Sequence, residues 1–70
     1  MIYNKSVEER MKAFYESLSE KDRRRYAAVE SLKLSHGGKK YICNLLGCDL
    51  KTLKRGIIEI HDEEELKKKG

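Results

Sequence analysis

The sequence of 70 residues lacks proline and tryptophan entirely and contains only two cysteines. The absence of proline removes the residue that most strongly interrupts helices, which favours helices throughout. Cys43 and Cys48 both fall at apolar positions of the pattern, so we interpret them as reduced core residues of a cytosolic protein. A zinc site takes about four ligands, and His36 and His61 are too distant to complete one. We therefore expect no metal site and no cofactor.

Long apolar runs are also missing from the sequence. A membrane-spanning helix needs about 20 consecutive apolar residues, and no segment approaches that length. Residues 1–10 contain no apolar run of signal-peptide length. We expect a cytoplasmic protein without a membrane partner.

The composition indicates one small folded domain. Charged residues make up 40% of the chain and apolar residues 39%, and the apolar ones are too regularly spaced for a disordered chain. No strand-like alternation is visible, so an all-α fold is expected. We predict a small four-helix domain over residues 1–61, followed by a charged tail or the start of a linker at 62–70. The predicted helices lie at about 7–18, 20–35, 39–46 and 50–60.

The first two predicted helices have recognisable starts and apolar stripes. Ser6 and Glu9 form a capping box, and Ser19 is a candidate N-cap for the second helix. The first predicted stripe contains Val7, Met11, Phe14 or Tyr15, and Leu18; the second contains Tyr26, Val29, and Leu32 or Lys33. Ala27 and Ala28 would allow a neighbouring helix to pack closely.

Residues 39–60 have the pattern of two short helices joined by a tight turn. Gly47 can end the first helix in a left-handed conformation, and Asp49 is a suitable N-cap for the second. The apolar positions of the two helices are Ile42, Cys43 and Leu46, then Leu50, Leu53, Ile57 and Ile60. This pattern is typical of a helix-turn-helix, in which the second helix enters the major groove of DNA.

Cations gather on this same segment, within a chain of net charge +4. Lys51, Lys54 and Arg55 fall on the outer face of the second helix. Lys39 and Lys40 follow Gly38 at the start of the first helix, where the helix dipole favours acids and where backbone N–H groups can bind a phosphate. An anionic partner explains these two lysines more easily than helix stability does.

Three features leave alternatives open. The run Arg23–Arg25 spreads around its helix, so one stem is expected to pack and one or two to face out, either solvated or on phosphate. Tyr41 can pack in the core or donate its hydroxyl to phosphate. Gly56 costs about 1 kcal/mol in a helix, which suggests that a neighbouring helix or a DNA backbone passes close to it.

The segment 18–60 resembles the N-terminal DNA-binding region of bacterial insertion-sequence transposases with a DDE catalytic domain. The matching motifs are L-S-E-K-D-R-R-x-x-A-A-x-E at 18–30, H-G-G at 36–38 and L-L-G-C-x-x-K-T-x-x-R-G-I-x-E at 45–59. The resemblance implies binding to the ends of a transposable element, in transposition and DNA recombination near the bacterial nucleoid. It assigns Lys51, Thr52, Lys54, Arg55 and Gly56 to the recognition helix. Since those transposases are several times longer, this chain resembles an excised domain or truncated copy.

The leading hypothesis is sequence-specific binding of double-stranded DNA, with helix 50–60 in the major groove. The residues expected at DNA are Lys39, Lys40, Tyr41, Lys51, Thr52, Lys54, Arg55 and Arg24. No enzyme activity is expected, because the resemblance places the catalytic carboxylates in another domain; no small-molecule substrate is expected either. The alternative is a protein-interaction or oligomerisation module built on the same fold. Self-association is compatible with both hypotheses, and Ile58, off the inner stripe, is a candidate for an exposed apolar contact.

Overall fold

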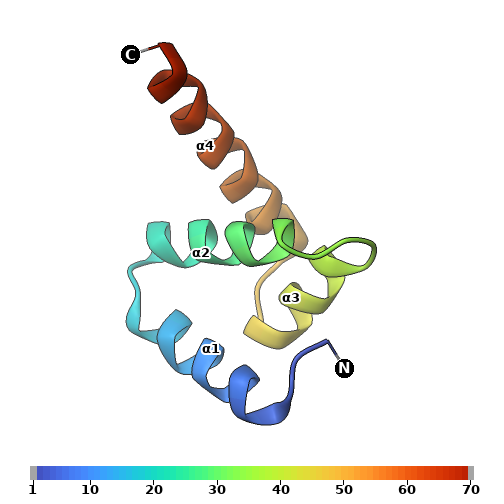
Figure 1. Ribbon diagram of the computed structural model, residues 1–70. Helices are drawn as coiled ribbons and strands as arrows, with labels where there is room; N and C mark the ends of the chain where they lie inside the picture. Colours follow the sequence, from blue (N-terminus) through green and yellow to red (C-terminus); the bar gives the residue numbers. More distant parts are fainter. Residues whose placement is uncertain (1, 70) are drawn as a thin grey trace.

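The computed structural model describes the backbone of residues 2–69 and the side chains of residues 2–63. It contains four helices, which Figure 1 shows in chain order: α1 (Lys5–Ser17), α2 (Glu20–Leu32), α3 (Gly38–Leu46) and α4 (Leu50–Lys69). The described residues contain no strand. The predicted all-α fold with four helices is therefore confirmed.

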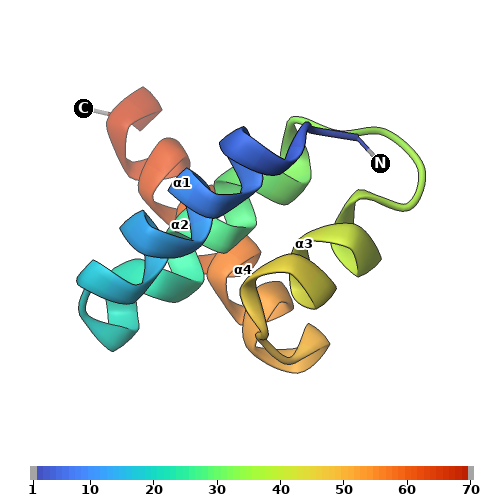
Figure 2. The same cartoon turned by 90° about the horizontal axis from the view of Figure 1, so that it is seen from below.

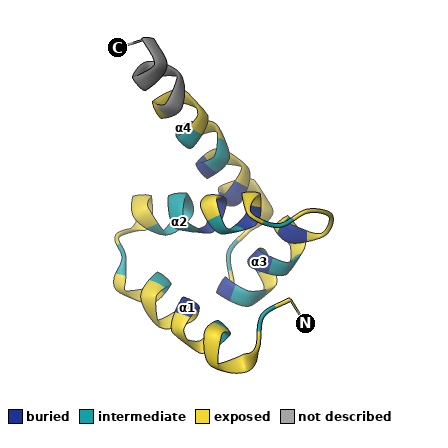
Figure 3. Cartoon of the chain, in the orientation of Figure 1, coloured by how far each residue is buried: buried dark blue, intermediate teal, exposed yellow. Residues whose placement is uncertain are grey.

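Helix α2 is the central element of the fold. It packs most extensively against α4, next against α3, and also contacts α1. Figures 1 and 2 show α1 and α3 on one side of α2, while α4 crosses α2 and extends away from the other helices. Figure 3 shows buried positions where α2, α3 and α4 meet. The buried apolar residues are Met11, Ala27, Ala28, Ile42, Leu46 and Leu53.

The first helix starts earlier than its capping box predicts. Asn4, not Ser6, is the N-cap, and its side-chain oxygen accepts a hydrogen bond from the Val7 N–H at 2.9 Å. Asparagine caps helices as well as serine does, so the earlier residue can take this role and Ser6 lies inside the helix. Of the two aromatic candidates for the inner stripe, Tyr15 packs against the core. Phe14 is half-exposed and packs its ring edge against Tyr26.

Helix α2 begins as predicted but buries a different face. The Ser19 hydroxyl accepts a hydrogen bond from the Asp22 N–H at 3.3 Å, which confirms Ser19 as the N-cap. The predicted stripe through Val29 and Leu32 is wrong, because both side chains are exposed. The buried face consists instead of Ala27, Ala28 and Ser31. Small side chains on this face allow α3 and α4 to approach the helix closely.

Two glycines mark the points of closest approach to α2. A Cβ atom built on Gly56 would lie 2.3 Å from the Arg24 carbonyl oxygen and 3.2 Å from the Ala28 Cβ. A Cβ on Gly38 would lie 2.9 Å from the Ser31 carbonyl oxygen of α2, and 2.7 Å from the Cβ of Leu34 just after that helix. The question that the sequence leaves open at Gly56 therefore has a structural answer: helix α2 passes there, and glycine is needed for the close approach.

The turn between α3 and α4 has the predicted form. Gly47 adopts a left-handed conformation with φ of 73°, and its N–H donates to the Cys43 carbonyl at 2.9 Å. The Cys48 N–H donates to the same oxygen at 3.1 Å, so two hydrogen bonds close the helix end. Helix α4 then starts at Leu50, directly after Asp49.

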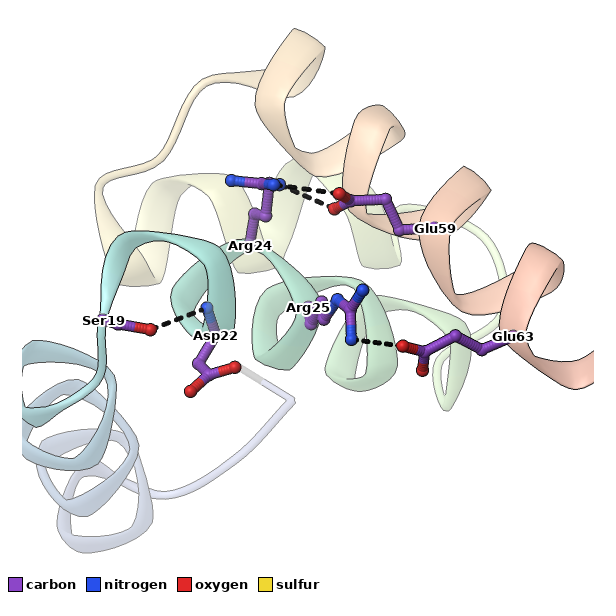
Figure 4. A network of polar contacts seen from close by, with 6 residues as sticks. All are labelled: Ser19, Asp22, Arg24, Arg25, Glu59 and Glu63. Carbon is purple, nitrogen blue, oxygen red and sulfur yellow. Dashed lines mark hydrogen bonds and ion pairs between the residues drawn. The ribbon is translucent and has the colours of Figure 1, made fainter.

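Helix α4 continues well past its predicted end at Ile60. It runs to Lys69, through the boundary predicted between residues 61 and 62, as one uninterrupted helix. Glu59 and Glu63 project from it toward α2, where each binds an arginine (Figure 4). These ion pairs give α4 tertiary contacts at Glu59 and, beyond its predicted end, at Glu63, which the sequence pattern alone does not reveal. The side chains of the charged tail beyond residue 63 lie outside the described residues.

Candidate nucleic-acid interface

Five exposed cations lie at the N-terminal ends of two adjacent helices. Lys39 and Lys40 start α3, and Lys51, Lys54 and Arg55 occupy the first two turns of α4. Neither helix has an acidic residue in its first turn. Among the described side chains, none of these five forms a salt bridge. Because a helix N-terminus disfavours positive charge, these cations do not serve helix stability.

The predicted recognition residues share the exposed side of α4. Lys51, Thr52, Lys54 and Arg55 are exposed, whereas Leu53 between them is fully buried. Successive helical residues are 100° apart, which places Lys51 and Arg55 on the side opposite Leu53 and Gly56. The structure thus brings these four residues together on the surface, as the helical pattern predicts.

A groove connects the lysines of α3 with the start of α4. It encloses about 810 Å³, and Lys39, Lys40 and Lys54 all line it. Its other lining residues are Ser31, Leu32, Leu34, Ser35, His36, Gly37, Gly38, Cys43, Asn44 and Leu50. At one end of the groove Gly37 precedes α3 with φ of 81°, and no side chain caps this helix. Since the first N–H groups of a helix lack intrahelical partners, they add positive potential here.

Arg24 is bound within the fold, although the sequence places it among the DNA-binding candidates. Its guanidinium makes two hydrogen bonds to the Glu59 carboxylate, at 2.6 and 2.9 Å (Figure 4). Their side chains are only 17% and 23% exposed. The hydrogen bonds from Arg24 lower the pKa of Glu59 and raise that of Arg24. This paired geometry holds α4 against α2, and Arg24 lies outside the candidate interface.

The other two arginines of the run are also partnered. Arg25 binds Glu63 at 2.5 Å (Figure 4). Arg23 donates to the backbone carbonyls of Tyr15 and Glu16 at 3.0 and 2.7 Å, and its guanidinium lies 5.5 Å from the Tyr15 ring centroid. The prediction that one or two of the three face out, either solvated or on phosphate, is therefore wrong, because each guanidinium binds a partner within the fold. Arg23 binds the end of α1, and the other two bind α4.

Tyr41 packs inside the protein, which was one of the two alternatives for it. Its hydroxyl donates to the Glu8 carboxylate and accepts a hydrogen bond from the Tyr3 N–H at 3.3 Å. Burial, and then the hydrogen bond to Glu8, raises the pKa of the Tyr41 hydroxyl. These contacts tie α1 and the N-terminal segment to α3. We leave Tyr41 out of the candidate interface.

Three groove residues were missed at the sequence level. Asn44 lies one helical turn after Lys40, and it is exposed and lines the groove. Leu32 and Leu50, placed on inner stripes by their spacing, are instead exposed there. The spacing of Lys40 and Asn44 on one helix face was the only signal for Asn44. The sequence contained no signal for the exposure of the two leucines, because their exposure results from how α2 and α4 meet.

The two cysteines lie near the turn as free thiols. Both are half-buried and pack against the core. Burial raises the pKa of the Cys48 thiol to about 11, and the neighbouring Cys43 adds to the effect. Among the described residues, His, Cys, Asp and Glu nowhere form a group of three that could hold a metal ion.

Comparisons with known proteins identify no relative. No protein-family model matches the chain, and no curated protein or solved structure matches it. Within the part of the chain that the structure describes, none of the helices is both long and apolar enough to cross a membrane. Function must therefore be argued from the surface just described.

Proposed function

We propose that this domain binds double-stranded DNA through α3 and α4 acting as a helix-turn-helix. The observation that carries the proposal is the cluster of five exposed cations at the N-terminal ends of two helices joined by a short glycine turn. Phosphate contacts dominate the affinity of proteins for DNA, and Lys and Arg supply most of them. The partnered arginines of α2 leave this cluster as the main cationic surface among the described residues.

In the proposed complex the N-terminal half of α4 enters the major groove. Lys51 and Arg55 then lie toward base edges or flanking phosphates, with Thr52 and Lys54 beside them. An arginine that binds guanine is the commonest specific contact to DNA, so Arg55 is the leading candidate for base recognition. Helix α3 crosses the backbone, as the first helix of such a motif does. The resemblance to insertion-sequence transposases suggests the ends of a transposable element as the target.

We propose a binding role without catalysis. The described acids of α4 do not form a cluster suited to metal-dependent cleavage, since Glu59 and Glu63 each bind an arginine. A two-metal nuclease needs carboxylates free to hold ions about 4 Å apart. A nuclease assay with Mg²⁺ and supercoiled plasmid should show no cleavage, and cleavage by the purified domain would overturn this part of the proposal.

The test is a fluorescence-anisotropy titration of the domain into a labelled random duplex at several salt concentrations. If the proposal holds, the logarithm of the binding constant falls linearly with the logarithm of salt. Lys51→Ala should weaken binding on all sequences and reduce the salt slope by about one. Lys12→Ala, an exposed lysine on α1, is the matched control and should change little. Absence of binding by the folded domain at low salt would refute the proposal.

The base-recognition role of Arg55 is tested separately, after a preferred sequence has been selected from a random pool. Arg55→Ala should weaken the free energy of binding to that sequence by about 1–3 kcal/mol and relax the base preference at one position. An equal loss of affinity on all sequences would instead identify Arg55 as a phosphate contact.

One observation favours the second candidate function, a protein-interaction module. Ile58 is 62% exposed and lies on the same outer side of α4 as the cationic residues. A single exposed isoleucine is common on protein surfaces, so this observation is weaker than the cation cluster. Sedimentation velocity of the domain and of Ile58→Ser tests it. A dimer that dissociates on this substitution would support self-association through α4.

A further inference from the structure

The groove between α2, α3 and α4 is lined by leucines, which we call its floor, and by lysines, which we call its rim. Leu32 and Leu50 are 51% and 44% exposed, and they lie with Leu34 in the same depression of about 810 Å³. Leu32 ends α2 and Leu50 starts α4, so the floor spans two helices. Exposed leucines that are gathered in one groove differ from apolar residues scattered singly, because together they offer a continuous surface to a partner.

The rim of this groove has one sign of charge. Lys39, Lys40 and Lys54 line it, and none of its described lining residues is acidic. The uncapped N-terminus of α3 lies at the same place and adds a partial positive charge. Positive potential over an apolar floor is complementary to a ligand that presents apolar and acidic groups side by side.

We propose that this groove is a docking site for an acidic amphipathic helix of a partner protein. Amphipathic helices bind grooves by inserting apolar residues spaced three or four positions apart. In the docked helix such residues cover Leu32 and Leu50, while flanking Glu or Asp side chains pair with Lys39, Lys40 and Lys54. DNA fits this groove less well, because a phosphate backbone satisfies the lysines but offers no apolar side chain to cover the leucines.

Docking of such a helix competes with DNA for the groove lysines. Lys39, Lys40 and Lys54 are the shared residues, since the proposed DNA complex places them near phosphates. The competition rests on the proposed DNA-binding function, whereas docking itself does not. A bound acidic helix would thus release the domain from DNA, and a substitution confined to the leucines separates the two activities.

The experiment uses a fluorescein-labelled synthetic peptide of about four helical turns, with leucine at every third or fourth position and glutamate elsewhere. Its control has the same composition with the leucines moved off a single face. Leu32→Ser and Leu50→Ser should each weaken binding of the amphipathic peptide about tenfold. Val29→Ser, which changes an exposed apolar residue of α2 outside the groove, is the matched control and should leave binding unchanged.

Three further measurements complete the test. Lys54→Glu should weaken binding of the acidic peptide at least as much as the leucine variants do. Circular dichroism of each variant distinguishes lost binding from lost folding. In ¹⁵N NMR spectra of the wild type, the peptide should shift the amide signals of the groove residues and spare those of α1.

Several results would overturn the proposal. They are equal binding of both peptides, binding that is unaffected by the leucine substitutions, peptide shifts that fall elsewhere, and concentration-dependent self-association that shifts the same amides. The last would assign the groove to a second copy of the chain. A loss of DNA affinity in Leu32→Ser without any peptide binding would assign it to DNA instead. Peptide binding in a domain that fails to bind DNA would refute the proposed function and leave docking intact.

Discussion

Replacing Gly56 by alanine is the sharpest test of how α4 is held against α2. The added Cβ would lie 2.3 Å from the carbonyl oxygen of Arg24 and 2.9 Å from its carbonyl carbon. Both atoms belong to the backbone of α2, so no side-chain rotation can make room. Ordinary contact begins at 3.4 Å, and the helices must therefore separate locally by about 1.1 Å (3.4 − 2.3).

Two effects of opposite sign determine how much Gly56→Ala changes the free energy of unfolding. In an unobstructed helix interior, alanine is about 1 kcal/mol more favourable than glycine. Overpacking a well-packed contact typically costs about 1–3 kcal/mol, and the upper value applies here because the obstacle is backbone. The expected net loss in the free energy of unfolding is about 2 kcal/mol. For a domain of this size each kcal/mol lowers the Tm by about 4–8 °C, so a decrease of about 8–16 °C is expected.

The assay is thermal and urea unfolding followed by circular dichroism. Thr52→Ala is the matched control, because Thr52 lies one turn before Gly56 on α4 and its side chain is exposed. That substitution should be neutral or stabilising by up to about 0.7 kcal/mol, the range of helix propensities. If Gly56→Ala raised the Tm instead, the gain in helix propensity would exceed the cost of overpacking. The close passage of α2 over Gly56 would then be refuted, and with it the structural explanation for glycine at this position.

Three further outcomes are expected. Because Arg24 lowers the pKa of Glu59, the ion pair stabilises the fold above the unfolded pKa of about 4.5 and is lost as the pH falls through the lower folded value. In urea titrations, Glu59→Gln should therefore be less stable than the wild type at pH 7 and equal to it in strong acid; an unchanged difference at all pH values would contradict the ion pair. Cys48, whose pKa of about 11 replaces the ordinary 9.0, should react with iodoacetamide at pH 8 about 100-fold more slowly in the folded protein than in urea, as measured by peptide mass spectrometry. Asn4→Ala should destabilise the domain by about 1 kcal/mol in chemical unfolding, whereas Ser6→Ala should have almost no effect; the reverse order would restore the capping box as the start of α1.

The α3–α4 segment was predictable because its signals are local. Helix α3 ends where Gly47 adopts the left-handed conformation, and α4 begins at Leu50, directly after Asp49, a residue type favoured at N-caps. Burial of Ile42 and Leu53 follows directly from helical spacing. The exposure of Lys51 and Arg55 follows from the same spacing, since they fall on the opposite side of the helix.

The face that α2 presents to its neighbours could be predicted from the sequence only in part, through Ala27 and Ala28, which were expected to allow close packing. Periodicity selects large apolar residues, so it selects Val29 and Leu32, yet a central helix that touches three others needs small residues at the crossings. Ala27 and Ala28 meet this need, and the larger side chains are displaced to the surface. The spacing of a stripe says which residues share a face, and tertiary packing decides which face is buried.

The partners of the three arginines at 23–25 could not be predicted from the sequence, for a different reason. Arg24 and Glu59 are separated by 35 positions, and no local pattern relates two charges so far apart. Their pairing depends on the angle at which α4 crosses α2, which the close contact at Gly56 helps to fix. The sequence analysis could identify a cationic run without showing that its charges are used within the fold.

The separation of charge along α4 connects the fold with the proposed function. The first two turns carry Lys51, Lys54 and Arg55, and the described acids Glu59, Asp62 and Glu63 follow. Two of these acids neutralise arginines of α2, so the part of the helix that anchors the fold is electrostatically satisfied. A duplex that lay along the whole helix would bring its phosphates against Asp62, which is exposed and shares the outer side with Arg55. In the proposed complex the favourable approach is therefore end-on, with the N-terminal turns of α4 in the major groove of DNA and the described acids Glu59, Asp62 and Glu63 directed away from the duplex. A single helix that enters by two turns reads few base pairs, so high affinity requires the phosphate contacts of Lys39 and Lys40 or a second binding unit.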